Sequence, residues 1–256
     1  MTADDIRQHL TSETFGRSLH LFDSLESTND TAKRLASQGA PEGTVVIALE
    51  QRSGRGRQNR TWISEPGKNL TFTVILRPRI TPEFLGIVSL YASVAVATSV
   101  SSLTGKEAGC KWPNDVVISG KKISGILCES AISGNSVDSV VMGIGLNVNQ
   151  REFPDDIAEK STSLLLETGT ATDLSAALCS VLGDLETLYL PSGAGWPAAM
   201  ISEWTKRNVI LGSRVEAMVR SSRITGIARS VTPAGALRIE TDGRMVEVAA
   251  GDVHLV

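Results

Sequence analysis

The sequence has few of the residues that mark a disulfide-bonded or metal-binding protein. Its 256 residues include 3 cysteines and 3 histidines. Cys110, Cys128 and Cys179 form no CxxC pair, which is typical of reduced thiols in a cytosolic protein rather than of a disulfide framework or a zinc ribbon. The histidines have no cysteine or carboxylate cluster beside them, so neither a zinc site nor histidine-based catalysis is indicated.

Positive charge is not in excess. Lys and Arg total 25 against 28 Asp and Glu, a net charge of -3, so no global positive field would attract nucleic acid or anionic lipid. Residues 1–16 lack the cationic and apolar regions of a secretory signal. The longest apolar stretch, about 84–103, contains repeated Ser and Thr and predicts a buried helix rather than a membrane span. We therefore expect a cytoplasmic protein without a membrane segment.

Two common nucleotide-binding motifs are missing. The chain has no GxxxxGK[ST], and Gly143-Ile144-Gly145 lacks the third glycine of a dinucleotide fingerprint. Neither a P-loop nor a Rossmann site is supported. Any nucleotide must be bound by another device.

The length and the residue patterns predict two domains. Hydrophobic residues make up 41% of the chain and charged residues 21%, which is ordinary for a globular protein. The chain is longer than one common domain, so we expect a large domain over 1–210 and a small one over 211–256. Helices are predicted at about 28–37, 84–103, 173–189 and 196–207, and strands at 19–22, 44–49, 70–76, 116–118, 123–129 and 139–146. Five short strands, at 214–219, 224–231, 237–241, 245–248 and 253–256, predict a small β-barrel.

The segment 51–62 combines glycines with three arginines. Arg55, Arg57 and Arg60 alternate with small or polar residues and precede Trp62. Glycines let a backbone wrap closely around a ligand, and guanidinium groups bind carboxylate or phosphate in bidentate fashion. The segment is therefore either an anion-binding lid or a solvated basic patch that contacts RNA. Its position between two predicted strands favours a folded site.

Two further motifs are compatible with a site, although each alone is more often structural. Lys111-Trp112-Pro113-Asn114-Asp115 forms an ordinary turn before a strand. Lys121 and Lys122 follow, and because strand side chains alternate between faces, only one of them enters a site. Gly143, Gly145 and Asn147 end a later strand, where glycines permit close approach of a ligand or another backbone.

Together with Ser27-Thr28-Asn29, these motifs resemble the catalytic domain of biotin protein ligases, a family that includes bifunctional biotin repressors. The similarity covers about residues 19–149, and the C-terminal strands resemble the family's small SH3-like domain more loosely. The resemblance implies an α+β fold: a mixed, mainly antiparallel sheet with helices, similar to class II synthetases, followed by an SH3-like barrel. It leaves no room for the N-terminal helix-turn-helix domain of the repressors, so we expect a monofunctional ligase.

The resemblance also implies a reaction and its residues. Biotin would be activated with ATP to biotinyl-5′-AMP, releasing pyrophosphate, and then transferred to a lysine of a biotin carboxyl carrier protein domain of a biotin-dependent carboxylase. The implied catalytic residues are Lys122, Arg57 and Asp115. The implied biotin-binding residues are Ser27, Thr28, Asn29, Gln51, Arg55, Gly56, Arg57 and Lys122. The implied ATP-binding and adenylate-binding residues are Arg57, Arg60, Trp62, Asn114, Lys122, Gly143, Gly145 and Asn147.

Some features are left open by the resemblance. Mg²⁺ is expected with the β and γ phosphates of ATP, where Asn114 and Asp115 are the candidates for arranging that end and Asp115 is a candidate, though not a firm, metal ligand. We expect a monomer or a homodimer that binds neither nucleic acid nor membrane. The alternatives are a lipoate or octanoyl ligase or transferase, a biotin-responsive transcriptional repressor, and a non-catalytic binding module. The arginine-bearing loop and the KWPND motif favour biotin ligation over lipoate chemistry.

Overall fold

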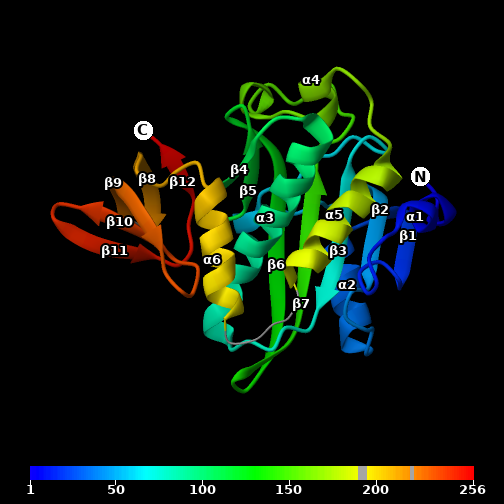
Figure 1. Ribbon diagram of the computed structural model, residues 1–256, viewed down its shortest axis with the longest axis horizontal. Helices are drawn as coiled ribbons and strands as arrows, with labels where there is room; N and C mark the ends of the chain where they lie inside the picture. The colour runs from blue at the N-terminus through cyan, green and yellow to red at the C-terminus, as the bar shows by residue number, and fades with distance from the viewer. Residues whose placement is uncertain (190–194, 220–221) are drawn as a thin grey trace.

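A seven-stranded sheet forms the centre of the large domain (Figure 1). The computed structural model describes residues 1–189, 195–219 and 222–256. The strand order is β1-β2-β3-β7-β6-β5-β4. Strands β1 and β2 are parallel, and every other neighbouring pair is antiparallel. The strands are β1 Leu19–Leu25, β2 Val45–Gln51, β3 Leu70–Leu76, β4 Ala108–Lys111, β5 Asp115–Ile118, β6 Lys121–Ser133 and β7 Ser136–Leu146.

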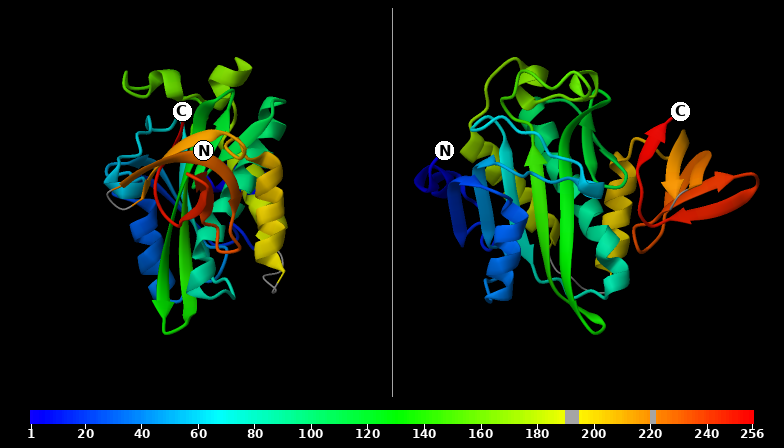
Figure 2. Two further views of the ribbon diagram at one scale, coloured as in Figure 1. Left: turned by 90° about the vertical axis from the view of Figure 1, so that its left-hand side faces the viewer. Right: turned by 180° about the vertical axis from the view of Figure 1, so that it is seen from behind.

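Helices cover the two faces of this sheet unequally. One face packs against α3 (Leu85–Thr104), which α5 (Leu174–Tyr189) and α6 (Trp196–Arg207) cover in turn. The other face carries α2 (Thr28–Ser37), seen from behind in Figure 2. Alternation along β2 explains both cores, because Val45 and Ile47 point toward α3 while Val46 packs against α2. The small α2 leaves part of its face uncovered, and the candidate site lies there.

The long apolar helix lies in the protein core. Residues 82–104 have the length and hydropathy of a membrane span, but 67% of the most apolar window is buried inside the structure. Its side chains pack against the sheet and two helices. The sequence prediction of a buried helix is confirmed.

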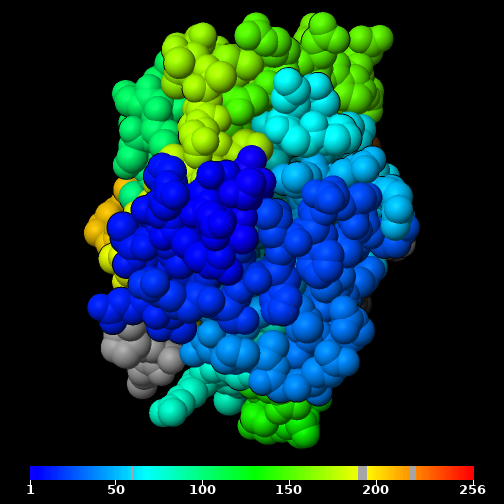
Figure 3. Space-filling view, turned by 90° about the vertical axis from the view of Figure 1, so that its right-hand side faces the viewer, coloured from blue at the N-terminus to red at the C-terminus, as the bar shows by residue number. Residues whose placement is uncertain are grey.

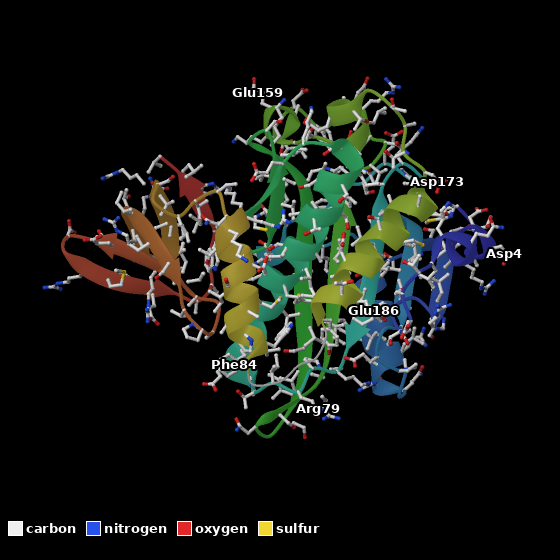
Figure 4. The ribbon with its side chains drawn as sticks, viewed as in Figure 1. Asp4, Arg79, Phe84, Glu159, Asp173 and Glu186 are labelled. Atoms are coloured by element: carbon white, nitrogen blue, oxygen red, sulfur yellow. The ribbon has the colours of Figure 1, made fainter. Side chains whose placement is uncertain are left out.

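The N-terminal segment packs on the outside of α5 (Figure 3). Helix α1 (Ala3–His9) buries Ile6, and Phe15 lies in the same core. Glu186 of α5, labelled in Figure 4, accepts hydrogen bonds from the backbone amides of Glu13 and Thr14 at 2.6 and 2.5 Å. A carboxylate thus holds the chain as it enters β1.

The C-terminal strands form a separate antiparallel sheet beside α6 (Figure 2). Its order is β11-β10-β9-β8-β12. The buried Trp112 of the large domain donates its indole N–H to the carbonyl of Gly235 at 2.9 Å. The two domains are therefore joined through the KWPND motif. The strands are β8 Arg214–Val219, β9 Ser222–Val231, β10 Leu237–Thr241, β11 Arg244–Val248 and β12 Val253–Leu255.

Most predicted elements are present. The strand over 70–76 and the helix over 196–207 have the expected bounds, and β6 and β7 are longer than predicted because their exposed hairpin continues past the sheet. Helix α2 begins after Ser27 as expected, but the Ser27 side chain makes no capping hydrogen bond. The prediction missed α1, β4 and the short α4 (Leu164–Thr168). These are too short for a clear hydrophobic period.

Candidate functional site

One cavity of about 1530 Å³ brings together the candidate residues that the sequence scatters over 120 positions or so. It lies on the α2 face of the sheet, under the 52–62 loop, and reaches the C-terminal domain. Every residue proposed from the sequence lines it: Ser27, Thr28, Asn29, Gln51, Arg55, Gly56, Arg57, Arg60, Trp62, Asn114, Asp115, Lys122, Gly143, Gly145 and Asn147. Their individual ligand contacts remain predictions.

One end of the cavity is uncharged and polar. Thr28 donates its backbone N–H and its hydroxyl to Gln51 Oε1, at 2.8 and 3.0 Å. Ser27 and Thr28 are 5% and 3% exposed, so little of either residue is in contact with solvent. Such groups suit a neutral ring that carries both hydrogen-bond donors and acceptors.

The Asn29 amide in this pocket already has protein partners. Its Nδ2 donates to the Leu127 carbonyl at 3.1 Å and to the Glu129 carboxylate at 2.8 Å. Its Oδ1 lies 2.7 Å from the Thr73 hydroxyl. Asn29 therefore ties α2 to β3 and β6, and in this state it orients the ring pocket rather than offering free donors.

Glycines on β6 and β7 make room for the side chains of the site. A Cβ on Gly143 would lie 2.2 Å from Asn29 Oδ1, and a Cβ on Gly145 would lie 2.2 Å from the Trp62 indole. Gly125 pairs with Gly145 across the strands and would meet both Trp62 and Lys122. The three glycines form the floor of the site, and a side chain at any of them would require Asn29, Trp62 or Lys122 to move.

The 52–62 loop folds back on itself as a small hairpin. Trp62 N–H donates to the Gly54 carbonyl at 3.0 Å, and Gly56 N–H donates to the Arg60 carbonyl at 2.7 Å. The turn at 57–59 is at its tip. Fixing the stem of this hairpin therefore fixes both its tip and the indole of Trp62.

The arginines of this loop have different partners. Arg55 forms ion pairs with Asp30 and with Glu129. Arg60 forms an ion pair with Asp252 of the C-terminal domain. Within the described ranges, no carboxylate lies within 4.0 Å of Arg57. Burial lowers the pKa of Arg57, an effect opposed by the charge of Asp115, so this half-buried cation faces the cavity as an anion-binding group.

Lys122 lies at the centre of the charged end. Its ammonium is 2.6 Å from Asp115 Oδ1 and 5.7 Å from the centre of the Trp62 ring. The contact with Asp115 is an ion pair without hydrogen-bond geometry, since Oδ1 has no hydrogen-bond partner in the described part of the chain. Lys121 is exposed. The expectation that only one of the two lysines enters the site is confirmed.

A second lysine stands close to this pair. Lys111 of β4 lines the cavity, and burial lowers its pKa, with the charges of Lys122 and Lys160 acting in the same direction and Asp115 against them. Several cations thus surround one carboxylate. The excess positive charge suits a polyanion such as a phosphate chain.

The two asparagines of the site differ in what they offer. Asn114 donates to the Ile126 carbonyl at 2.6 Å and mainly holds β5 against β6. Asn147 donates to the Thr162 carbonyl at 3.0 Å, but its buried Oδ1 has no hydrogen-bond partner among the described residues, like Trp62 Nε1. Buried polar atoms of this kind are normally satisfied, so both atoms are available to a ligand.

Sequence reasoning missed several parts of the wall, among them residues 206–209. Residues 153–161, between β7 and α4, contribute Phe153, Ile157 and Lys160, and the C-terminal domain contributes 252–255. A polar, irregular segment directly after the glycine-bearing strand was a usable signal for residues 153–161. Nothing in the sequence indicated the C-terminal part, because domain packing alone brings it to the site.

A smaller cavity of about 720 Å³ adjoins the first. Both are lined by Arg55, Gly56 and Arg57 of the loop and by Trp112, Pro113, Ile126 and Leu127. The smaller cavity is further lined by residues of α3, β6, β7 and the C-terminal domain.

Family profiles and known proteins match this arrangement. The profile of the biotin/lipoate A/B protein ligase family matches residues 21–147, and that of the biotin protein ligase C terminal domain matches residues 210–256. A biotin--[acetyl-CoA-carboxylase] ligase of Mycobacterium tuberculosis is 35% identical over 246 residues, covering 93% of this chain and 90% of that protein. The chain belongs to the biotin protein ligase family.

Other members of the biotin protein ligase family are similar to this chain over all or nearly all of its length. A bifunctional ligase/repressor of Bacillus subtilis is 34% identical over 257 residues, covering 100% of this chain and 79% of that protein. The solved biotin protein ligase of Aquifex aeolicus in complex with biotin and ATP superposes with a TM-score of 0.75 at 29% identity, covering 94% of this chain and 100% of that one. The resemblance drawn from the motifs and the α+β fold it implied are confirmed, and the chain is an enzyme.

Proposed function

We propose that this enzyme attaches biotin to a carboxylase carrier protein in two steps. In the first, the biotin carboxylate attacks the α-phosphorus of ATP, and the bond to pyrophosphate breaks to leave biotinyl-5′-AMP. In the second, a lysine amine of the carrier attacks the acyl carbon, loses a proton and expels AMP. The relatives named biotin--[acetyl-CoA-carboxylase] ligases support this acceptor class.

The observation that carries the proposal is the division of one cavity into a neutral end and a cationic end. Ser27, Thr28 and Gln51 supply uncharged donors and acceptors at one end, and Arg57 and Lys122 supply positive charge at the other. Biotin has the same division, with a neutral ureido ring at one end and a carboxylate at the other. The biotin carboxylate would lie at the cationic end of the cavity, where the same positive charges would also bind the phosphates of ATP.

In the first step, Lys122 and Arg57 would neutralise two anions that must approach each other. Bringing a carboxylate to an α-phosphate is opposed by their charges, and preorganised cations in a partly desolvated site offset this repulsion. Arg60 and Trp62 would contact the nucleotide, with Asn114, Gly143, Gly145 and Asn147 on the same side. Asn147 Oδ1 and Trp62 Nε1 support this placement because both are buried without a protein partner in the described residues.

In the second step, Asp115 would take the proton from the attacking lysine. Its Oδ1 lies 2.6 Å from the ammonium of Lys122, and the residue lines the cavity. The acyl phosphate is already an activated electrophile, so the amine needs only to be neutral and aligned.

The donor set fits Mg²⁺ only as a companion of ATP. No cluster of three or more His, Cys, Asp or Glu side chains that could hold a metal occurs in the described part of the chain. Mg²⁺ commonly keeps several waters and binds through substrate phosphates and one or two carboxylates. When bound it would screen the β and γ phosphates, and Asp115 is the one protein ligand we propose.

The deciding experiment measures ATP-dependent incorporation of biotin into a carrier domain. Wild-type protein should label the carrier and release pyrophosphate, whereas K122A should do neither. Lipoate and octanoate tested in parallel should give no adenylate. Equal activity with lipoate would support the lipoate ligase alternative. If no pyrophosphate were released with either biotin or lipoate, ligation would be contradicted.

We further propose that the enzyme works in the cytoplasm as a monomer or a homodimer and binds no nucleic acid. The net charge of -3 supports the last point. Sedimentation with and without biotin and ATP would establish the assembly. Retention of the protein by DNA at low salt would favour the repressor alternative.

A further inference from the structure

We propose that Arg55 is a positioning residue that fastens the 52–62 loop over the site, and that it is not a ligand-binding arginine. It does so through an alternating square of charges made by Asp30, Lys33, Arg55 and Glu129. This inference rests on the proposed function for its kinetic consequence only. Its structural part can be tested without any substrate.

The square joins three separate parts of the chain. Asp30 and Lys33 lie on α2, Glu129 on β6 and Arg55 in the loop. The guanidinium of Arg55 contacts Asp30 and lies 3.7 Å from Glu129. The ammonium of Lys33 lies 2.5 Å from Glu129 and 3.7 Å from Asp30. Each carboxylate thus lies between two cationic side chains, so the charges of the four residues sum to zero.

Glu129, the carboxylate of β6 that pairs with Arg55, is itself held in place by other residues. Glu129 also accepts a hydrogen bond from Asn29 at 2.8 Å, and Asn29 is 4% exposed. Thr73 lies 2.7 Å from Asn29 Oδ1 and 2.8 Å from the Thr28 hydroxyl, which donates to Gln51. A continuous chain of polar contacts therefore connects the fastening point of the loop to the neutral ring pocket.

The surroundings of Arg55 disfavour an anionic ligand. A biotin carboxylate that approached this guanidinium would meet the negative charges of Asp30 and Glu129. Arg57, two residues later, has no carboxylate within 4.0 Å among the described residues. The two arginines of the glycine-rich run therefore divide the work: the first holds the loop and the second binds the ligand.

Few contacts hold the loop: besides those of Arg55, Arg60 pairs with Asp252 of the C-terminal domain, and Trp62 packs against Gly145. Arg52, Ser53, Arg55, Gln58, Arg60 and Thr61 are all exposed. Arg52 and Ser53 bind Glu26 before the hairpin begins, so they do not fix its stem. Arg55 pairs with Thr61 across the stem. Fixing the Arg55 side chain therefore also fixes the tip of the hairpin, which carries Arg57, and the position of Trp62.

The first test measures hydrogen exchange of the backbone amides of residues 52–62 in ligand-free protein. Partly exposed ion pairs each shift an opening equilibrium by about two- to fivefold. R55Q, D30N and E129Q should therefore raise exchange in the loop about two- to fivefold. E240Q breaks a comparable exposed ion pair, Arg229 with Glu240 at 2.6 Å in the C-terminal sheet, and should leave the loop unchanged. Loop exchange in R55Q equal to that in E240Q would overturn the proposal.

The second test is a double-mutant cycle on the ion pair between Arg55 and Asp30. Because R55Q and D30N each remove this same pair, D30N/R55Q should raise loop exchange by less than the product of the two single effects. Effects of R55Q and D30N that multiply, with a folded core by circular dichroism, would contradict the charge square.

The third test separates the two arginines by kinetics. R55Q should raise the KM for biotin and the release rate of biotinyl-5′-AMP about two- to fivefold, with kcat at saturating substrate within about twofold. R57Q should lower kcat itself. A kcat loss in R55Q as large as in R57Q would make Arg55 a ligand-binding residue. If the wild-type protein forms no adenylate while R55Q still loosens the loop, the proposed function fails and the fastening role stands.

Discussion

The ammonium of Lys122 lies 2.6 Å from Oδ1 of Asp115, and this pair forms the centre of the charged end of the cavity. The register places Asp115 opposite Gly125, and a bulge follows between Val116 and Val117 before Val117 pairs with Lys122. The irregular register brings the lysine back toward the aspartate. Both groups are partly exposed, so the pair stabilises the fold little and its value lies in the site.

Removal of Lys122 should abolish the first chemical step. We expect K122Q to lower adenylate formation by about 100-fold or more, because a preorganised cation at the reacting anions is lost. Pyrophosphate release at saturating biotin and ATP measures this. The matched control is K121Q, on the opposite face of the same strand, which should retain activity. Equal loss in both variants would indicate a general charge effect.

Substitution of Asp115 should slow the second step when that step is measured apart from the first. We expect D115N to slow transfer of biotin from preformed adenylate to the carrier by about 10-fold to 100-fold. Chasing purified enzyme-bound biotinyl-5′-AMP with carrier domain across a pH series isolates this step, and higher pH should partly restore it by deprotonating the acceptor lysine. Normal transfer in D115N would remove Asp115 from the mechanism.

Addition of one methyl group to the floor should displace Trp62. A Cβ on Gly145 would lie 2.2 Å from the indole, so G145A should cost about 1–3 kcal/mol of unfolding free energy through overpacking and raise the KM for ATP. Urea unfolding and initial rates measure the two effects. G195A is the control, since a Cβ there meets no described residue within 4 Å. Unchanged ATP binding in G145A would show that Trp62 does not contact the nucleotide.

Lys111 should couple nucleotide binding to protons. Its pKa in the free protein lies below the usual 10.5, chiefly through burial, so the unfolded chain binds more protons and this lysine destabilises the fold at neutral pH. The penalty shrinks as pH rises toward 10.5. A bound phosphate chain raises the pKa again. ATP affinity should therefore be highest below the pKa of Lys111 in the free enzyme and decline as pH rises through it.

Calorimetry of ATP binding in buffers of different ionisation enthalpy would detect the proton uptake by Lys111 at alkaline pH. K111Q should abolish that uptake, whereas K121Q should not alter it. Identical proton uptake in K111Q and wild-type protein would place the linkage elsewhere.

Much of the fold could be predicted from local patterns. The strand over 70–76 and the helix over 196–207 have unambiguous hydrophobic periods and clear turn residues at their ends. The four-residue β4, Ala108–Lys111, could not be recognised, because its residues favour no strand by themselves and pairing with β5 stabilises it. Short elements depend on partners that are distant or not yet folded.

The sequence by itself determined which residues could carry the chemistry: the arginines of the glycine-rich loop, the KWPND turn, one lysine of the Lys121-Lys122 pair and the glycines of β7. Tertiary structure alone decided which partners these residues have. Arg55 meets Asp30 and Glu129, and Arg60 meets Asp252, whereas Arg57 faces the cavity. The physical reason is that the role of a charged side chain depends on which charges packing places beside it, and these partners come from segments far apart in the chain.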